Sequence, residues 1–245
     1  MLPVIRAGLS SFTTKHCELR IRTNRRESAA RPPAYLLGNR AGALEALGRY
    51  AQARDGYQEC EERAVQGTIA QQAFCVMGLV KVSLALGDST ATEHYLRQAG
   101  TLVQSSFPPG SPPYAALLTQ QGRFALKKGA LSEARSDFDA AIAANQNNVR
   151  ATSSLLGRAA LNLEVGQAAD AEADARRALA IAVKAQGGVR YSRLVGGAWL
   201  LLAKISRARN DSLAARDAAQ TAVAELFNTV DENHPLLLEA QQLAR

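Results

Sequence analysis

The feature that most constrains the fold is a pattern of small and large residues that recurs behind a turn residue. After Gly129, an apolar residue follows at two places, a small residue at five, an aromatic residue at nine and a small residue at twelve. Gly48 has followers of the same kinds, and weaker copies begin at Gly87, Gly166 and Asn210. Successive turn residues are 39, 42, 37 and 44 residues apart. The pattern therefore predicts five repeats.

Each repeat is expected to be a helical hairpin. The residue eleven places before each turn is apolar, and the residues seven places before are mostly small: Ala41, Val80, Gly122, Ala159 and Ala203. A small residue lets two helix backbones approach, while a large side chain fills the adjacent hollow. A glycine at the turn suits the left-handed conformation that ends a helix, and asparagine is its usual substitute.

The composition favours an all-α fold. The chain is 47% hydrophobic but only 5% aromatic. Ala, Leu, Arg, Gln and Glu dominate it, and these are good helix formers with few strand formers among them. We therefore expect an α-α superhelix of about five helical hairpins.

This pattern resembles the tetratricopeptide repeat over residues 34–245. Its spacing exceeds the ~34 residues of the standard repeat and is similar to the long-repeat, kinesin-light-chain-like variant. The Asn233-His234-Pro235 turn and the array before it are also similar to C-terminal repeat regions of bacterial serine/threonine kinases and regulators. The resemblance implies a solenoid that binds a protein or peptide in a concave groove.

The proline-rich segment 108–113 is expected to be a linker. The run from Phe107 to Pro113 holds four prolines and is predicted to be non-helical. It would separate units 1 and 2, in residues 34–107, from units 3 to 5, in residues 114–245. Leu236 to Ala244 is expected to form a C-terminal capping helix that covers the end of the stack.

The basic charge lies mostly in an N-terminal arm. The chain carries a net charge of +7, of which residues 1–33 hold +5, leaving +2 for the other 212 residues. We expect the arm to be disordered or only locally structured. It could alternatively tether the chain to nucleic acid or an anionic membrane. The nearly neutral body argues against nucleic-acid binding along the repeats.

Three cysteines, Cys17, Cys60 and Cys75, are too few and too scattered for a disulfide framework. They indicate a reducing compartment, so the expected location is the cytoplasm. Cys60 and Cys75 fall where helices meet, and we expect them to be buried, inert thiols. The apolar stretch Leu194 to Ile205 is shorter than the roughly 20 residues that span a bilayer, so no transmembrane segment is predicted.

No constellation of residues indicates catalysis. The chain has three histidines, no HExxH motif and no kinase or phosphate-loop motif. His234, before a proline, is expected to be a turn residue. Glu172 and Asp174 alternate with basic residues and are interpreted as a solvated outer face with helix-range ion pairs. We therefore expect no enzyme activity, no small-molecule substrate, and no catalytic, cofactor-binding or metal-binding residues.

The candidate binding residues are basic side chains of the first helices. In such a stack these helices line the concave side. Six places before each turn, one residue points into the groove, and three of the five are basic: Lys81, Arg123 and Lys204. Lys127 and Arg207 lie one turn further along. These five residues are expected to favour an acidic peptide or carboxylate, although exposed basic residues are ordinary on helices.

The sequence thus predicts a non-catalytic interaction scaffold in signalling or regulation. One alternative is the detached C-terminal regulatory region of a larger, kinase-type enzyme. The other is the nucleic-acid or anionic-membrane tether formed by residues 1–33. The pattern identifies neither the partner nor the oligomeric state.

Overall fold

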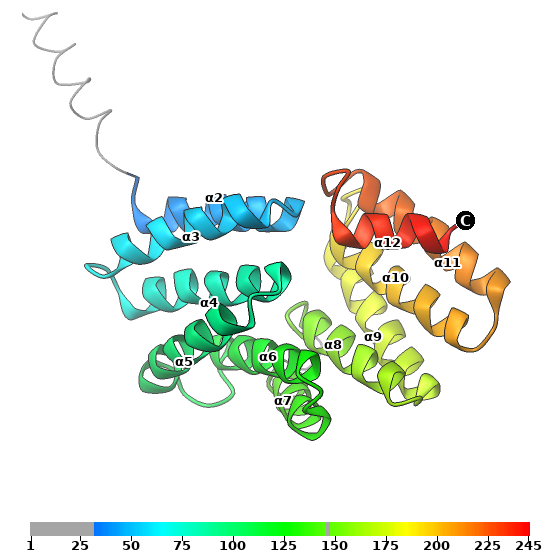
Figure 1. Cartoon of the computed structure of the whole chain (residues 1–245), viewed down its shortest axis with the longest axis horizontal. Helices are drawn as coiled ribbons and strands as arrows, with labels where there is room; N and C mark the ends of the chain where they lie inside the picture. The colour runs from blue at the N-terminus through cyan, green and yellow to red at the C-terminus, as the bar shows by residue number, and fades with distance from the viewer. Residues whose placement is uncertain (1–31, 146–147) are drawn as a thin grey trace, which may run out of the picture. The chain divides into compact units, whose positions relative to one another are not determined.

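The computed structural model describes residues 32–145 and 148–245, so the predictions for residues 1–31 lie outside the described residues. Residues 34–245 form one compact unit. Its described residues form helices and no strands (Figure 1). The helices are α2 (Ala34–Leu47), α3 (Tyr50–Ala64), α4 (Ile69–Leu86), α5 (Ser89–Ser106), α6 (Pro112–Lys127), α7 (Leu131–Ala144), α8 (Ala151–Glu164), α9 (Ala168–Gln186), α10 (Arg193–Ala208), α11 (Ser212–Phe227) and α12 (Pro235–Leu243).

The helices pair into the five predicted hairpins, from α2–α3 to α10–α11. Gly48, Gly87, Gly129, Gly166 and Asn210 join the members of each pair, and all five have positive φ angles, between 62° and 91°. The last helix, α12, packs on α10 and α11. The predicted all-α fold, with five hairpins and a capping helix, is confirmed.

The hairpins are stacked so that their first helices lie on the inside. Successive first helices, α2, α4, α6, α8 and α10, each contact the next. Among the described residues, the backbones of successive second helices stay further apart, although the side chain of Gln98 on α5 donates a hydrogen bond to Glu61 on α3. Because the first helices lie closer to one another than the second helices do, the row of hairpins curves toward the first helices. The first helices therefore line the inner surface of the unit (Figure 1).

Aromatic rings seated against glycines join neighbouring hairpins. The ring of Phe138, on α7, is fully buried between Gly122 of α6 and Gly157 of the next hairpin. A Cβ atom at either glycine would overlap this ring. Tyr57, on α3, meets Gly78 of α4 in the same way. Each ring therefore needs a backbone without side chain opposite it.

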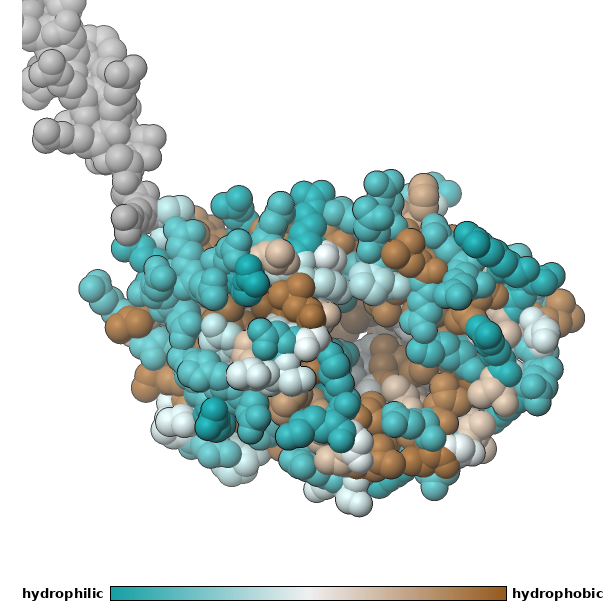
Figure 2. Space-filling model, in the orientation of Figure 1, coloured by the Kyte–Doolittle hydropathy of each residue, from teal (hydrophilic) through white to brown (hydrophobic). Residues whose placement is uncertain are grey.

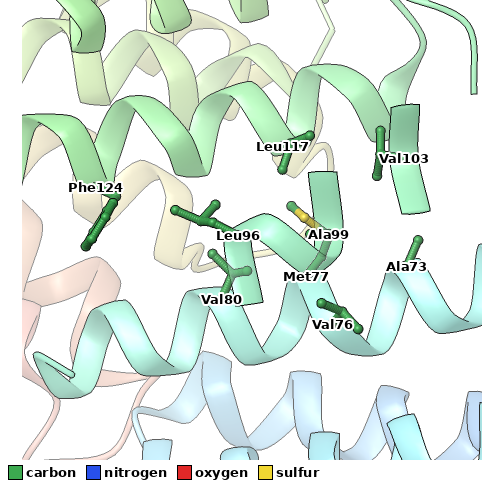
Figure 3. Close-up of a cluster of buried hydrophobic side chains, with 9 residues drawn as sticks. All are labelled: Ala73, Val76, Met77, Val80, Leu96, Ala99, Val103, Leu117 and Phe124. Atoms are coloured by element: carbon green, nitrogen blue, oxygen red, sulfur yellow. The ribbon is translucent and has the colours of Figure 1, made fainter. Parts of the chain in front are cut away.

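Helices α4, α5 and α6 share the apolar cluster shown in Figure 3. It links the second and third hairpins across the proline-rich segment. Val76 and Val80 from α4 meet Leu96 from α5 and Leu117 from α6 in this cluster. The weakest repeat in the sequence, the one at Gly87, therefore has an apolar core of its own.

Helix α4 is long and apolar enough to cross a membrane, judged by length and composition alone. The apolar stretch that the sequence pointed to, Leu194 to Ile205, lies in another helix, α10. In the structure its residues Val76, Leu79, Val80 and Val82 are fully buried against neighbouring helices. A core helix of a repeat protein passes the same test.

The expectation that Pro112 and Pro113 belong to a non-helical linker is wrong. Both residues lie in the first turn of α6, which Ser111 precedes as N-cap. A proline is tolerated there because the first turn of a helix has no partners for its N–H groups. The break is therefore confined to residues 107–111.

The expectation that Cys60 and Cys75 are inert thiols is also wrong. Both are fully buried, as predicted, but they form a disulfide with a Cα–Cα distance of 5.7 Å. Cys60 lies on α3 and Cys75 on α4, so the bond ties the first hairpin to the second. The disulfide removes the cysteine-based argument for a reducing compartment, and the cytoplasmic location stays a prediction.

Asp174 does not belong to the solvated outer face where the sequence placed it. It is 7% exposed and accepts hydrogen bonds from Arg158 at 2.6 and 2.8 Å and from Asn162 at 3.3 Å. These bonds raise the pKa of the Arg158 guanidinium further above its usual value. Glu172 does pair with Arg176 one turn along its helix, as expected.

Replacing Gly157 by alanine is expected to destabilise the fold by about 1–3 kcal/mol, because the new methyl group overlaps the Phe138 ring. Gly100→Ala is the matched control. Gly100 also lies in a helix but has open space at its Cβ position, so alanine there should stabilise by roughly 0.5–1 kcal/mol. Urea unfolding of both variants tests this, and equal shifts would contradict the packing argument.

Loss of the disulfide is expected to lower the free energy of unfolding by about 3 kcal/mol, since it closes a loop of 15 residues. The double variant Cys60→Ala/Cys75→Ala should melt at the same temperature with or without reductant. The native chain should melt at a lower temperature only when it is reduced. A thiol count that is identical in the denatured chain before and after reduction would contradict the bond.

Candidate binding site on the inner surface

The inner surface surrounds a hollow that is visible at the centre of Figure 2. The five basic residues predicted for the groove lie on α4, α6 and α10. Lys81, Arg123 and Lys204 are half-buried, and Lys127 and Arg207 are exposed.

Three of these five residues are engaged within the chain. Lys81 forms an ion pair with Glu45 at 3.4 Å, and Lys204 pairs with Glu239 of the capping helix at 2.8 Å. Lys127 donates a hydrogen bond to the carbonyl oxygen of Leu84 at 3.2 Å, near the end of α4. The ammonium groups of these three lysines therefore already bind groups on other helices.

Arg123 has no such partner. Within the described ranges, its guanidinium makes no ion pair and no hydrogen bond. Burial lowers its pKa, and so does the like charge of Arg193, whereas Glu45 and Tyr50 raise it. These four residues come from α2, α3, α6 and α10, and these helices belong to both ends of the unit.

Glu45 is held in place at the edge of this group. In addition to its ion pair with Lys81, Glu45 accepts a hydrogen bond from the hydroxyl of Tyr57 at 3.1 Å. Burial and the neighbouring carboxylate raise the pKa of Tyr57, so that hydroxyl remains a donor. The single carboxylate of the group is therefore already engaged by two other side chains.

A pocket beside Lys81 continues the inner surface toward α8. Its lining includes Thr119 and Gln120 of α6, together with Arg150 and Ser153. These groups are hydrogen-bonding side chains that suit a polypeptide backbone. Among the described residues, no group of three or more His, Cys, Asp or Glu side chains could hold a metal ion.

The two ends of the unit are joined by a contact that we call the clasp, formed by Leu47, Gly48, Arg49, Tyr50, Asp231 and His234. Arg49 donates to Asp231 through Nε and Nη2, with an Nε–Oδ2 distance of 2.6 Å and an Nη2–Oδ1 distance of 3.3 Å. The backbone N–H of Asp231 donates to the carbonyl oxygen of Leu47 at 3.2 Å. Arg49 lowers the pKa of Asp231, which keeps this carboxylate charged.

His234 is the buried centre of the clasp, with 2% of its surface exposed. Its Nδ1 accepts a hydrogen bond from the N–H of Leu236 at 3.1 Å and thereby caps α12. The neutral ring therefore carries its proton on Nε2, which lies 3.4 Å from the hydroxyl of Tyr50. The ring also lies against Gly48, where a Cβ would meet it.

Sequence reasoning missed Glu45, Arg193 and the role of His234 in the clasp. Arg193 is the first residue of α10 and lies outside the positions that the repeat pattern marks. His234 was correctly placed in a turn, but its partners are 184 and 186 residues earlier in the chain. No local signal connects such distant residues.

Acidification is expected to weaken the clasp. Burial and the charge of Arg193 lower the pKa of His234 below 6.5, against the opposing effect of Asp231. The folded state therefore binds the proton less well than the unfolded state. The stability that this histidine contributes is complete above about pH 6.5 and is lost as the pH falls through the lowered pKa. Melting temperatures between about pH 5 and 8 should show this loss.

His234→Asn is the informative variant for this prediction, because asparagine can cap α12 but does not titrate. Its melting temperature should depend less on pH below about 6.5 than that of the native chain. His94→Asn is the control, since His94 is exposed on α5. If both variants keep the native pH dependence, His234 is not its source.

No protein-family model and no curated protein matches the sequence. Solved structures with a similar fold include the following two. TTC0263, a thermophilic TPR protein of Thermus thermophilus, is 18% identical, with a TM-score of 0.60 over 86% of this chain and 98% of that one. BtubC (BKLC) from P. vanneervenii is 16% identical, with a TM-score of 0.56 over 74% and 75%. The chain therefore has the fold of tetratricopeptide-type, kinesin-light-chain-like helical repeat proteins.

Proposed function

We propose that the chain is a non-catalytic scaffold in signalling or regulation, and that it holds an acidic segment of a partner protein against its inner surface. Its fold supports the general role, because solenoids of this type present a concave surface to proteins and peptides. The surface also offers the hydrogen-bonding side chains of the pocket beside Lys81.

The observation that carries the proposal is the guanidinium of Arg123, which is half-buried on the inner helix α6 and makes no ion pair or hydrogen bond within the described residues. A cation that is partly removed from water without a counter-ion costs free energy, and a bound carboxylate would offset that cost. A charge-assisted hydrogen bond of this kind is stronger than one between neutral groups. An acidic ligand is thus favoured over a neutral one.

The five predicted residues then contribute unequally. Lys81 and Lys204 have to leave Glu45 and Glu239 before they can bind a ligand fully. Arg123 needs no such exchange, and Arg207 is exposed at the end of α10. We therefore assign the main contribution to Arg123 and a supporting one to the others.

The variant Arg123→Glu should bind a labelled peptide of alternating glutamate and glycine at least about tenfold more weakly than the native chain, a loss of about 1.4 kcal/mol. The substitution removes a donor and adds a repelling charge. Fluorescence anisotropy measures both affinities directly.

Arg177→Glu provides the control, because Arg177 is exposed on α9, a second helix. It changes the net charge by the same amount as Arg123→Glu. Equal losses in the two variants would show general electrostatic attraction rather than a site. If the native chain does not bind the peptide, the proposal is wrong.

A further inference from the structure

The clasp closes the row of hairpins into a ring around the hollow. Successive hairpins contact one another along the row, and the clasp joins the first hairpin to the loop before α12 (Figure 1). A folded domain of 100 residues has a radius of gyration of about 13 Å, so it does not pass through a hollow inside residues 34–245. A segment with a folded domain on each side therefore enters the hollow only if the ring opens.

The clasp is mostly polar and open to solvent. Arg49 and Asp231, which form its ion pair, have 49% and 33% of their side chains exposed. Solvent also reaches the clasp through a cleft between residues 47–49 on one side and 230–234 on the other. An ion pair exposed in this way contributes little to stability, because water replaces the partner when the pair separates. The buried part of the clasp is the His234 ring, which lies against the bare backbone of Gly48.

The other junctions of the ring are held more firmly. The disulfide binds the first hairpin to the second. Val80 and Leu117 lie in the apolar cluster between the second and third hairpins, Phe138 is buried between the third and fourth, and Ala159 and Leu202 share a cluster between the fourth and fifth. Among residues 32–145 and 148–245, no apolar cluster contains side chains from both the first hairpin and the last. The clasp is therefore the junction that opens at the lowest free energy.

We propose that the clasp is a gate: the ring opens between residues 47–50 and 231–234 while the hairpins stay packed on one another, and a segment of a partner protein enters the hollow from the side. Small rotations at the four other junctions separate the two ends, because rotations add along a row of repeats. The inference rests on the proposed function for the identity of the occupant, and it adds how that occupant gains access.

Opening is tested without a ligand by hydrogen exchange of the Asp231 backbone N–H, because its hydrogen bond to the carbonyl oxygen of Leu47 crosses the clasp. The variant Arg49→Asp places two acids against each other. It is expected to speed this exchange, relative to the intrinsic rate of the amide, at least about tenfold and to leave the amides of α8 unchanged. Arg49→Asp/Asp231→Arg restores the pair with its charges exchanged and should return exchange at residue 231 to near the native value.

Access is tested with the segment of alternating glutamate and glycine in two forms. The free form has free ends, and the blocked form carries a folded protein at each end. Stopped-flow fluorescence measures both association rates. The native chain should bind the blocked form at least about tenfold more slowly than the free form, because the blocked form has to wait for the gate. Arg49→Asp should raise the ratio of the blocked rate to the free rate at least about tenfold, and the exchanged pair should reverse this effect.

Arg177→Asp is the matched control, because Arg177 is exposed on α9 and its substitution changes the net charge by the same amount. It should keep the native ratio. A further variant holds the gate shut: Arg49→Cys/Asp231→Cys, in a Cys17→Ser background, is bridged by a short bismaleimide. The bridged chain should exclude the blocked form and still bind the free form. The melting temperature of every variant shows whether it is folded.

The outcomes separate the gate from the proposed function. If the two forms bind the native chain equally fast, or if the bridged chain still binds the blocked form, the gate is overturned and the scaffold function stands. If Arg49→Asp speeds exchange in α8 as strongly as at Asp231, the ring does not open apart from unfolding, which also overturns the gate. If neither form binds the native chain, both proposals are overturned.

Discussion

The seating of aromatic rings against glycines is the contact on which the rest of the structure depends. Phe138 fits between Gly122 and Gly157 only because neither glycine carries a side chain, and the same holds for Tyr57 at Gly78. These contacts set the distance between the first and second hairpins and between the third and fourth. The distance in turn sets how strongly the row of first helices bends, and hence which side chains meet across the hollow.

The sequence predicted the hairpins well because their signals are local. Turn residues such as Gly48 and Asn210 adopt positive φ angles for reasons that lie within one helix end. The buried positions follow from the same short spacing. The disulfide between Cys60 and Cys75 could not be predicted in this way, because it depends on which faces of α3 and α4 are turned toward each other.

The helix positions of the candidate site residues could be predicted, but their neighbours could not. Arg123 was correctly placed on an inner helix because its position follows from the repeat. The charged residues that raise or lower its pKa, Glu45 and Arg193, come from α2 and α10. They reach Arg123 only when the unit curves through all five hairpins, and the curvature is a sum of small rotations that no single repeat records.

The clasp has a consequence for the evolution of the chain. A solenoid with free ends tolerates the gain or loss of a repeat, because each hairpin contacts only its neighbours. Here Arg49 and His234 have partners at the opposite end of the array, so one additional hairpin would separate them. The clasp therefore holds only while five hairpins lie between its two halves, and inserting or deleting one of them would open it.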